Sequence, residues 1–70
     1  MIEFNFSTLF DEVKFICKLE RDYFDRFDGT HYYCYKIYMY VNDIYKRVFT
    51  RTVLSYSNLK KQLIEYIKNY

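Results

Sequence analysis

The sequence predicts a small α+β fold: an antiparallel three-stranded meander with a C-terminal helix on one face (βββα). Two stretches, residues 30–41 and 44–54, are rich in aromatic and β-branched residues and are separated by Asn42-Asp43. Residues 57–70 repeat leucine and isoleucine at helical spacing. The chain has 70 residues, of which 51% are hydrophobic and 24% aromatic, so we expect a single folded domain spanning residues 1–70.

The N-terminal segment carries two competing patterns. Val13, Phe15, Cys17 and Leu19 alternate with mostly polar residues, as in a strand, whereas Phe6, Phe10, Val13 and Cys17 also fit one face of a helix. The favoured interpretation is a short helical turn near residues 7–12 and a strand near 13–24. The alternative is one long helix from residue 7 to about 26, which changes the plan to αββα. "RFDGT", residues 26–30, is predicted to be a turn in both cases.

A tight two-residue turn at Asn42-Asp43 predicts the register of the hairpin that follows. Val41 would face Ile44, Met39 would face Lys46, and Ile37 would face Val48, which makes this the aliphatic core face. A slip of one residue in either strand would change these pairs and mix the two faces.

The other face of this hairpin is predicted to be aromatic and basic together. Tyrosine and arginine are enriched at interface hot spots, so the face is a candidate partner-binding surface. The competing interpretation is that the N-terminal segment covers it and the rings are ordinary core. The candidate residues are Tyr38, Tyr40, Tyr45, Arg47, Phe49 and Arg51.

Leu59, Leu63 and Ile67 recur every four residues and predict a C-terminal helix that covers the aliphatic face, with Leu63 and Ile67 beneath Ile37 and Val48. Ser55 or Ser57 can act as its N-cap. The free N–H groups at a helix start can hold a phosphate. A second candidate site, for phosphate or nucleic acid, is therefore Ser57, Lys60 and Lys61; the plainer interpretation is a solvated helix face.

The sequence contains few residues that are suited to enzymatic catalysis. His31 is the only histidine and Gly29 the only glycine, and no catalytic or cofactor motif is present. Cys17, His31 and Cys34 are one ligand short of a usual structural zinc site. We therefore expect no enzyme activity, no cofactor, no metal and two free thiols.

Charge and hydropathy indicate where the protein acts. The net charge of +2 is weak for a dedicated nucleic-acid binder, with acids concentrated in residues 1–28 and bases in residues 29–70. No apolar run approaches membrane-spanning length, and the N-terminus carries acids where an export signal needs bases. We expect a cytoplasmic protein in the interior of a host cell, without a membrane partner.

The frequent Tyr, Lys, Ile, Asn and Phe are typical of AT-rich genomes, and small domains of this usage are often encoded by phages, viruses or mobile elements. In plan alone the chain is similar to small phage-encoded inhibitors and to the sheet-plus-helix DNA-binding domains of some integrases. The predicted function is non-enzymatic binding of a host protein, as an inhibitor or adaptor, through the Tyr/Arg face. The alternative is a nucleic-acid-binding module using Arg47, Arg51, Lys60 and Lys61, and exposed tyrosines also favour a homodimer.

Overall fold

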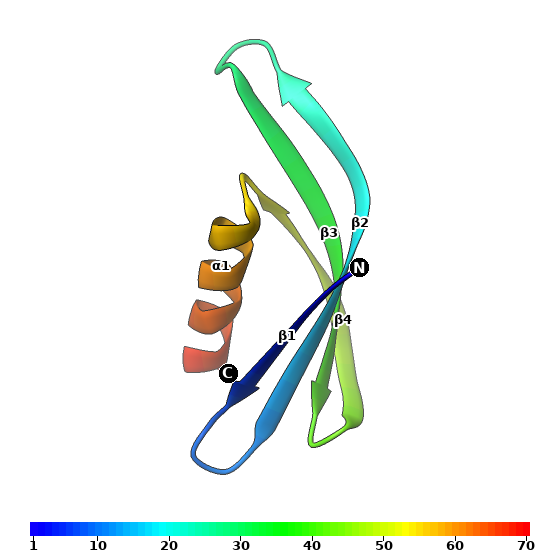
Figure 1. The fold of residues 1–70 in the computed structure, drawn as a ribbon, viewed down its shortest axis with the longest axis vertical. Helices are drawn as coiled ribbons and strands as arrows, with labels where there is room; N and C mark the ends of the chain where they lie inside the picture. The colour runs from blue at the N-terminus through cyan, green and yellow to red at the C-terminus, as the bar shows by residue number, and fades with distance from the viewer.

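A computed structural model describes all residues, 1–70, and shows a four-stranded antiparallel sheet followed by one helix (Figure 1). The strands pair in chain order, β1-β2-β3-β4. The α+β class, the antiparallel meander and the C-terminal helix are confirmed, but the sheet has one strand more than predicted. The elements are β1 (Ile2–Ser7), β2 (Glu12–Asp25), β3 (Thr30–Val41), β4 (Ile44–Val53) and α1 (Tyr56–Lys68).

The additional strand comes from the N-terminal segment. The prediction of a helical turn near residues 7–12 was wrong, and so was the alternative of a long helix. Residues 8–11 instead form the loop of a hairpin, closed by a hydrogen bond of 2.8 Å from the Thr8 amide to the Asp11 carbonyl. Ile2, Phe4 and Phe6 alternate with polar residues, which is the period of a strand with one buried face. The strand predicted near residues 13–24 is confirmed as β2.

Both predicted turns are present, and residues with positive φ form them. Asn42 and Asp43 have φ of 51° and 65°, as a type I′ hairpin turn requires, and Val41 pairs with Ile44. Gly29 has φ of 68°, and its amide donates to the Asp25 carbonyl at 2.9 Å. The side chain of Asp25 also accepts from the Phe27 amide, at 2.8 Å.

A β-bulge in β4 changes the predicted register. Tyr40 pairs with Tyr45, but Met39 pairs with Arg47, so Lys46 is an extra residue on β4. From that point every pair is shifted by one: Ile37 faces Phe49 rather than Val48. The predicted pairs beyond Tyr45 were therefore wrong, because a bulge adds a residue without any Gly or Pro to mark it in the sequence.

One face of the sheet, together with α1, makes the core. The Ser55 side chain caps the helix by accepting from the Asn58 amide at 3.2 Å, and Leu59 and Leu63 are fully buried. Ile67 is half-buried against them, whereas Val48 is 41% exposed on the opposite face, which corrects its predicted place in the core. The buried residues are Phe4, Val13, Phe15, Cys17, Ile37, Met39, Val41, Val53, Leu59 and Leu63.

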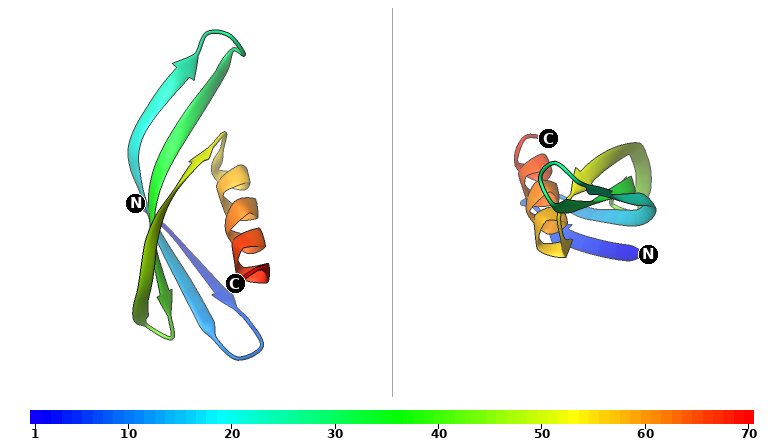
Figure 2. Two further views of the ribbon diagram at one scale, coloured as in Figure 1. Left: turned by 180° about the vertical axis from the view of Figure 1, so that it is seen from behind. Right: turned by 90° about the horizontal axis from the view of Figure 1, so that it is seen from above.

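The β2–β3 hairpin extends beyond the rest of the sheet as a two-stranded arm (Figures 1 and 2). The pairing of β4 with β3 ends at Tyr33 and Val53, so only β2 and β3 continue from there. This arm contributes to the elongated shape of 44 × 19 × 16 Å. The single helix is too short and too polar to cross a membrane.

Replacement of Leu63 by alanine should destabilise the fold by about 2–5 kcal/mol, because a fully buried leucine leaves a cavity between helix and sheet. Urea denaturation measures this free energy. Lys61→Ala, at an exposed site on the same helix, is the control and should stay within about 0.5 kcal/mol of the parent chain. Equal stability of both variants would contradict the placement of α1.

Deletion of Lys46 tests the bulge. Without it, regular pairing still places Phe49 opposite Ile37, so stability should change by only about 1 kcal/mol. Deletion of Thr50 is the control, because it turns either Phe49 or Val53 to the wrong face and should cost at least about 1.5–3 kcal/mol. An equally large loss for both deletions in a urea titration would mean that β4 carries no bulge.

Candidate functional site: an uncovered sheet face and an arginine cleft

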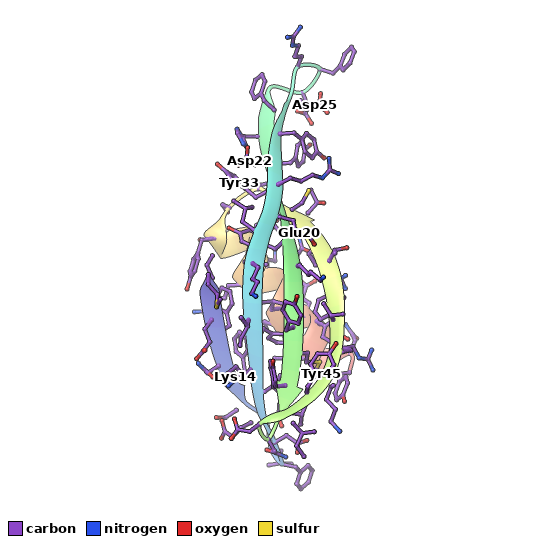
Figure 3. All side chains as sticks on the ribbon, turned by 90° about the vertical axis from the view of Figure 1, so that its right-hand side faces the viewer. Lys14, Glu20, Asp22, Asp25, Tyr33 and Tyr45 are labelled. Atoms are coloured by element: carbon purple, nitrogen blue, oxygen red, sulfur yellow. The ribbon has the colours of Figure 1, made fainter.

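The face of the sheet opposite α1 has no element packed over it (Figure 3). Residues that pair across neighbouring strands share a face, so the register shows which side chains lie together here. We call it the open face, and its central residues are Lys14, Ile16, Lys18, Lys36, Tyr38, Tyr40, Tyr45 and Val48.

Lysines and tyrosines contact each other across the centre of the open face. The Lys14 ammonium lies 5.2 Å from the centre of the Tyr40 ring, while Lys18 and Lys36 lie 5.4 and 5.7 Å from that of Tyr38. These distances are within the range of cation–π attraction. Tyr38 and Tyr40 are half-buried by these neighbours, so each ring is partly ordered before any partner binds.

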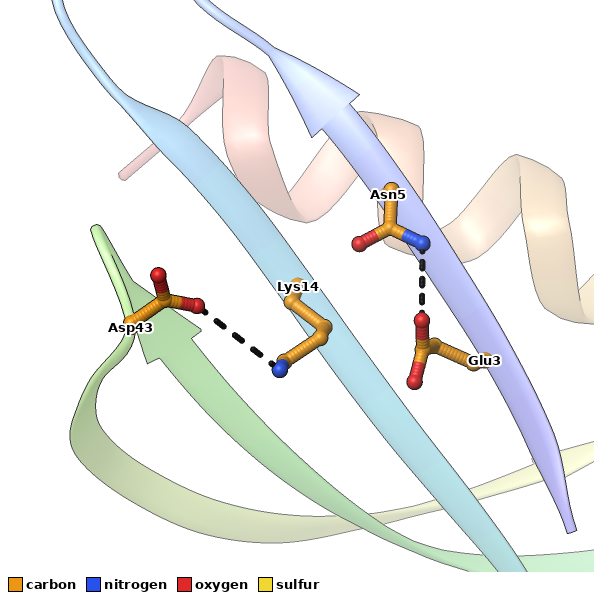
Figure 4. A network of polar contacts seen from close by, with 4 residues as sticks. All are labelled: Glu3, Asn5, Lys14 and Asp43. Atoms are coloured by element: carbon orange, nitrogen blue, oxygen red, sulfur yellow. Dashed lines mark hydrogen bonds and ion pairs between the residues drawn. The ribbon is translucent and has the colours of Figure 1, made fainter.

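Two carboxylates on or beside the open face, those of Asp43 and Glu3, partly offset its positive charge (Figure 4). Asp43 in the β3–β4 turn pairs with Lys14 at 3.8 Å, and Glu3 on β1 accepts from the Asn5 amide at 3.0 Å. Lys18 and Lys36 have no carboxylate within ion-pair distance, since the only other ion pair joins His31 to Asp22. The centre of the face therefore keeps positive charges that a partner can neutralise.

The aromatic and basic character continues onto the arm. Arg21 lies 5.5 Å from the Tyr23 ring, which stacks on Tyr32 at 5.3 Å between centres. The Tyr32 hydroxyl donates to the Asp28 carboxylate. This hydrogen bond lowers the pKa of Asp28 and raises the pKa of Tyr32. The tip of the arm is thus held by its own side chains.

The six residues predicted to share one face are divided between two. Tyr38, Tyr40 and Tyr45 lie on the open face, where Tyr40 and Tyr45 meet edge to face at 5.7 Å. Arg47, Phe49 and Arg51 lie on the helix side, so their predicted placement beside the tyrosines was wrong. The physical reason is the Lys46 bulge, which shifts every later residue of β4 by one and reverses its face.

On the helix side, Arg47 and Arg51 line a cleft between β4 and the C-terminal half of α1. Arg47 Nη1 donates to the Tyr66 hydroxyl at 3.0 Å, and the Arg51 guanidinium lies 4.8 Å from the Phe49 ring. Phe49 in turn stacks on Tyr66 at 4.6 Å, which ties β4 to the helix. The arrangement is a second cluster of cations and rings, separate from the open face.

The residues of the second predicted site, for phosphate or nucleic acid, lie on α1. Ser57, Lys60 and Lys61 line a shallow groove with Tyr56 and Lys68, and Ser55 rather than Ser57 caps the helix. No ion pair joins Lys61 to Glu65. The four residues proposed to bind nucleic acid together are therefore split, because Arg47 and Arg51 line the cleft whereas Lys60 and Lys61 line this groove.

Lys14, Lys18 and Lys36 were missing from the predicted site, although they are the cations nearest the tyrosines. The alternation of lysine with apolar residues in 13–19 was the available signal. It did not identify the site, because assigning Lys14 and Lys18 to the tyrosine face also required knowing that residues 12–25 pair with β3.

The two cysteines and His31 are not brought together. Cys17 pairs with Ile37 on the buried face, and Cys34 lies on the open face with its Sγ 3.4 Å from Thr52 Oγ1. Both cysteines are free thiols. His31 stacks on Tyr33 at 4.8 Å and contacts Asp22 at 3.2 Å.

Comparison with known protein-family models, curated proteins and solved structures finds no match for this chain.

Cys17 and Cys34 should differ in reactivity, because burial raises the pKa of the Cys17 thiol from 9.0 to about 11. At about pH 8.5, iodoacetamide should modify Cys34 in the folded protein and Cys17 only after unfolding. The raised pKa means that burial of Cys17 contributes fully to stability below about pH 9 and progressively less between 9 and 11. Mass spectrometry of peptides from native and denatured samples reads out each site, and rapid native labelling of Cys17 would contradict its burial.

Proposed function

We propose that the protein is a non-enzymatic binding module, an inhibitor or adaptor that engages a host protein through the open face. The observation that carries the proposal is the half-buried pair Tyr38 and Tyr40, flanked by lysine ammonium groups on a face with no covering element. A buried sheet face needs no such cations.

Partial order of the rings supports a binding role. Tyrosine contributes a large contact area with few rotatable bonds, so little conformational entropy is lost when a partner covers it. Here Tyr40 is held between Lys14 and Tyr45, and Tyr38 between Lys18 and Lys36. A surface ordered in advance gains affinity because the ordering cost is already met within the free protein.

The chemistry of the face indicates an acidic partner. Lys18 and Lys36 lack carboxylate partners, and Lys14 has only the exposed Asp43 at 3.8 Å. Acidic groups on a partner protein would pair with these lysines around a tyrosine centre, which is the usual arrangement of an aromatic core with a charged rim. The composition typical of phage, viral or mobile-element proteins supports the further proposal that this partner belongs to a host cell.

A second candidate, single-stranded nucleic acid, is favoured by one feature. Lys14, Lys18 and Arg21 follow one another along β2, and they lie next to the rings of Tyr40, Tyr38 and Tyr23, respectively. Such a line of cations beside rings can follow a phosphate backbone while bases stack on the aromatic side chains. The chain's small net charge of +2 keeps this candidate second.

Tyr40→Ala should weaken binding of a host protein recovered by pull-down from nuclease-treated lysate by about 1–4 kcal/mol. Calorimetry with the purified partner measures the change, and a thermal melt should show stability within about 1 kcal/mol of the parent. Arg51→Gln, on the opposite side of the sheet, is the matched control and should bind normally.

The salt dependence of binding distinguishes a protein partner from single-stranded nucleic acid. Protein binding through rings and a few lysines should weaken modestly between about 50 and 200 mM salt, whereas binding through several phosphates should fall by orders of magnitude. If Tyr40→Ala binds as well as the parent, the proposal for the open face fails.

A further inference from the structure

The cleft between β4 and α1 has the size and the donors of a small-molecule site. Its volume is about 760 Å³, within the range typical of ligand pockets. Strand β4 contributes two arginines, α1 contributes one amide, one carboxylate and one tyrosine, and the two residues after α1 contribute an amide and a tyrosine. The lining residues are Arg47, Arg51, Gln62, Glu65, Tyr66, Asn69 and Tyr70.

Neither arginine has a carboxylate partner. The ion pairs of the molecule are Lys14–Asp43 and His31–Asp22, so both guanidinium groups remain without a counter-charge within 4.0 Å. Arg47 donates to the neutral Tyr66 hydroxyl at 3.0 Å, and Arg51 donates to the Thr50 carbonyl at 2.8 Å. A guanidinium has five N–H donors, so most of the donors of each arginine are available to an anion.

Both guanidinium groups converge on Tyr66. Arg47 bonds its hydroxyl, and Arg51 lies 5.8 Å from its ring centre. Tyr70 stacks on Tyr66 at 6.4 Å, and Arg47 lies 5.6 Å from the Tyr70 ring. Tyr70 is 61% exposed, so it is accessible to a ligand. The cleft thus places forked cationic donors next to an accessible flat ring.

Two features of the cleft disfavour the binding of an anion. Glu65 lines the cleft, and the carbonyl end of α1 carries partial negative charge. The Asn69 backbone and side-chain amides already bond the Glu65 carbonyl, at 3.3 and 3.0 Å, and Lys68 lies in the last helical turn. Two full positive charges from the arginines therefore exceed the single carboxylate of Glu65 within the cleft.

We propose that this cleft binds a phosphate monoester attached to a flat ring, that is, a nucleoside monophosphate. The phosphate would accept from Arg47 and Arg51, since the guanidinium fork matches phosphate oxygens in a bidentate arrangement. The ring would stack on Tyr70, and the Tyr66 hydroxyl would keep its hydrogen bond from Arg47. This site is on the helix side of the sheet, so its test is independent of the open face.

Titration of the ¹⁵N-labelled protein with AMP, inorganic phosphate and adenosine tests the proposal. AMP should saturate amide shifts around Tyr66 and Tyr70, phosphate should bind the same residues more weakly, and adenosine should not saturate. Arg47→Gln and Arg51→Gln should each lower AMP affinity about tenfold or more, because each removes charge-assisted hydrogen bonds. Arg21→Gln, which removes one positive charge from the arm beside Tyr23, is the control and should leave the affinity unchanged.

Tyr70→Ala keeps the test decisive even if an arginine variant unfolds, because Tyr70 lies largely exposed beyond the last helical turn. It should reduce AMP affinity to that of inorganic phosphate and leave phosphate binding intact. AMP affinity unchanged in both arginine variants would overturn the site, as would the absence of saturation up to about 10 mM AMP, ten times a dissociation constant of about 1 mM. A preference for AMP over phosphate that survives Tyr70→Ala would overturn the ring-stacking part.

Discussion

The bulge at Lys46 is the constraint on which both surfaces of this protein depend. It adds one residue to β4 immediately after the turn, so that Phe49 and Val53 face the helix while Val48 faces away from it. Full burial of Val53, worth about 1.5–3 kcal/mol, and partial burial of Phe49 favour this register over the regular one. The regular register would bury Val48 and two threonines in their place.

The same shift brings Arg47 and Arg51 to the side of the helix. A guanidinium is costly to bury unless its donors and its charge find partners. Here the arginines lie at the edge of the core, where rings of Phe49, Tyr66 and Tyr70 contact them and the cleft keeps them in reach of water. Arginine suits this position because its flat guanidinium packs on aromatic rings while it retains its charge. The register chosen by two apolar residues therefore also creates the cleft.

A single helix can cover only one face of a four-stranded sheet, and this decides how the aromatic residues are used. On the covered face, Phe15 meets Phe6, Phe49 and Tyr66 at centre distances of 6.1–6.2 Å and makes a compact core for a short chain. On the open face, Tyr38 and Tyr40 rest against lysine ammonium groups instead of other core residues. Tyrosine suits the open face because its ring packs against neighbouring side chains while its hydroxyl remains hydrated at the surface.

The sequence was sufficient for the elements whose signals are local. Asn42-Asp43 predicted its turn because few residues tolerate positive φ, and Leu59 and Leu63 predicted the buried stripe of the helix. The sequence was insufficient where the outcome depends on pairing. Strand β1 was missed because its alternation of apolar and polar residues is only six residues long, and its extended form depends on pairing with β2, for example of Phe4 with Phe15. The Lys46 bulge leaves no local mark, so three of six candidate residues were assigned to the wrong face.

The open face and the arginine cleft lie on opposite sides of the same strand, β4. Alternate residues of β4 serve opposite sides: Arg47, Phe49 and Arg51 face the helix, while Val48, Thr50 and Thr52 belong to the open face. Because one layer of backbone separates the surfaces, a partner on the open face and a small ligand in the cleft would not compete for space. They would still share β4, whose outer edge has no neighbouring strand and whose helix contact depends on the Phe49–Tyr66 stack at 4.6 Å. Ordering of that stack by a ligand would also order the strand that carries Tyr45, so any coupling between the two surfaces would pass through β4.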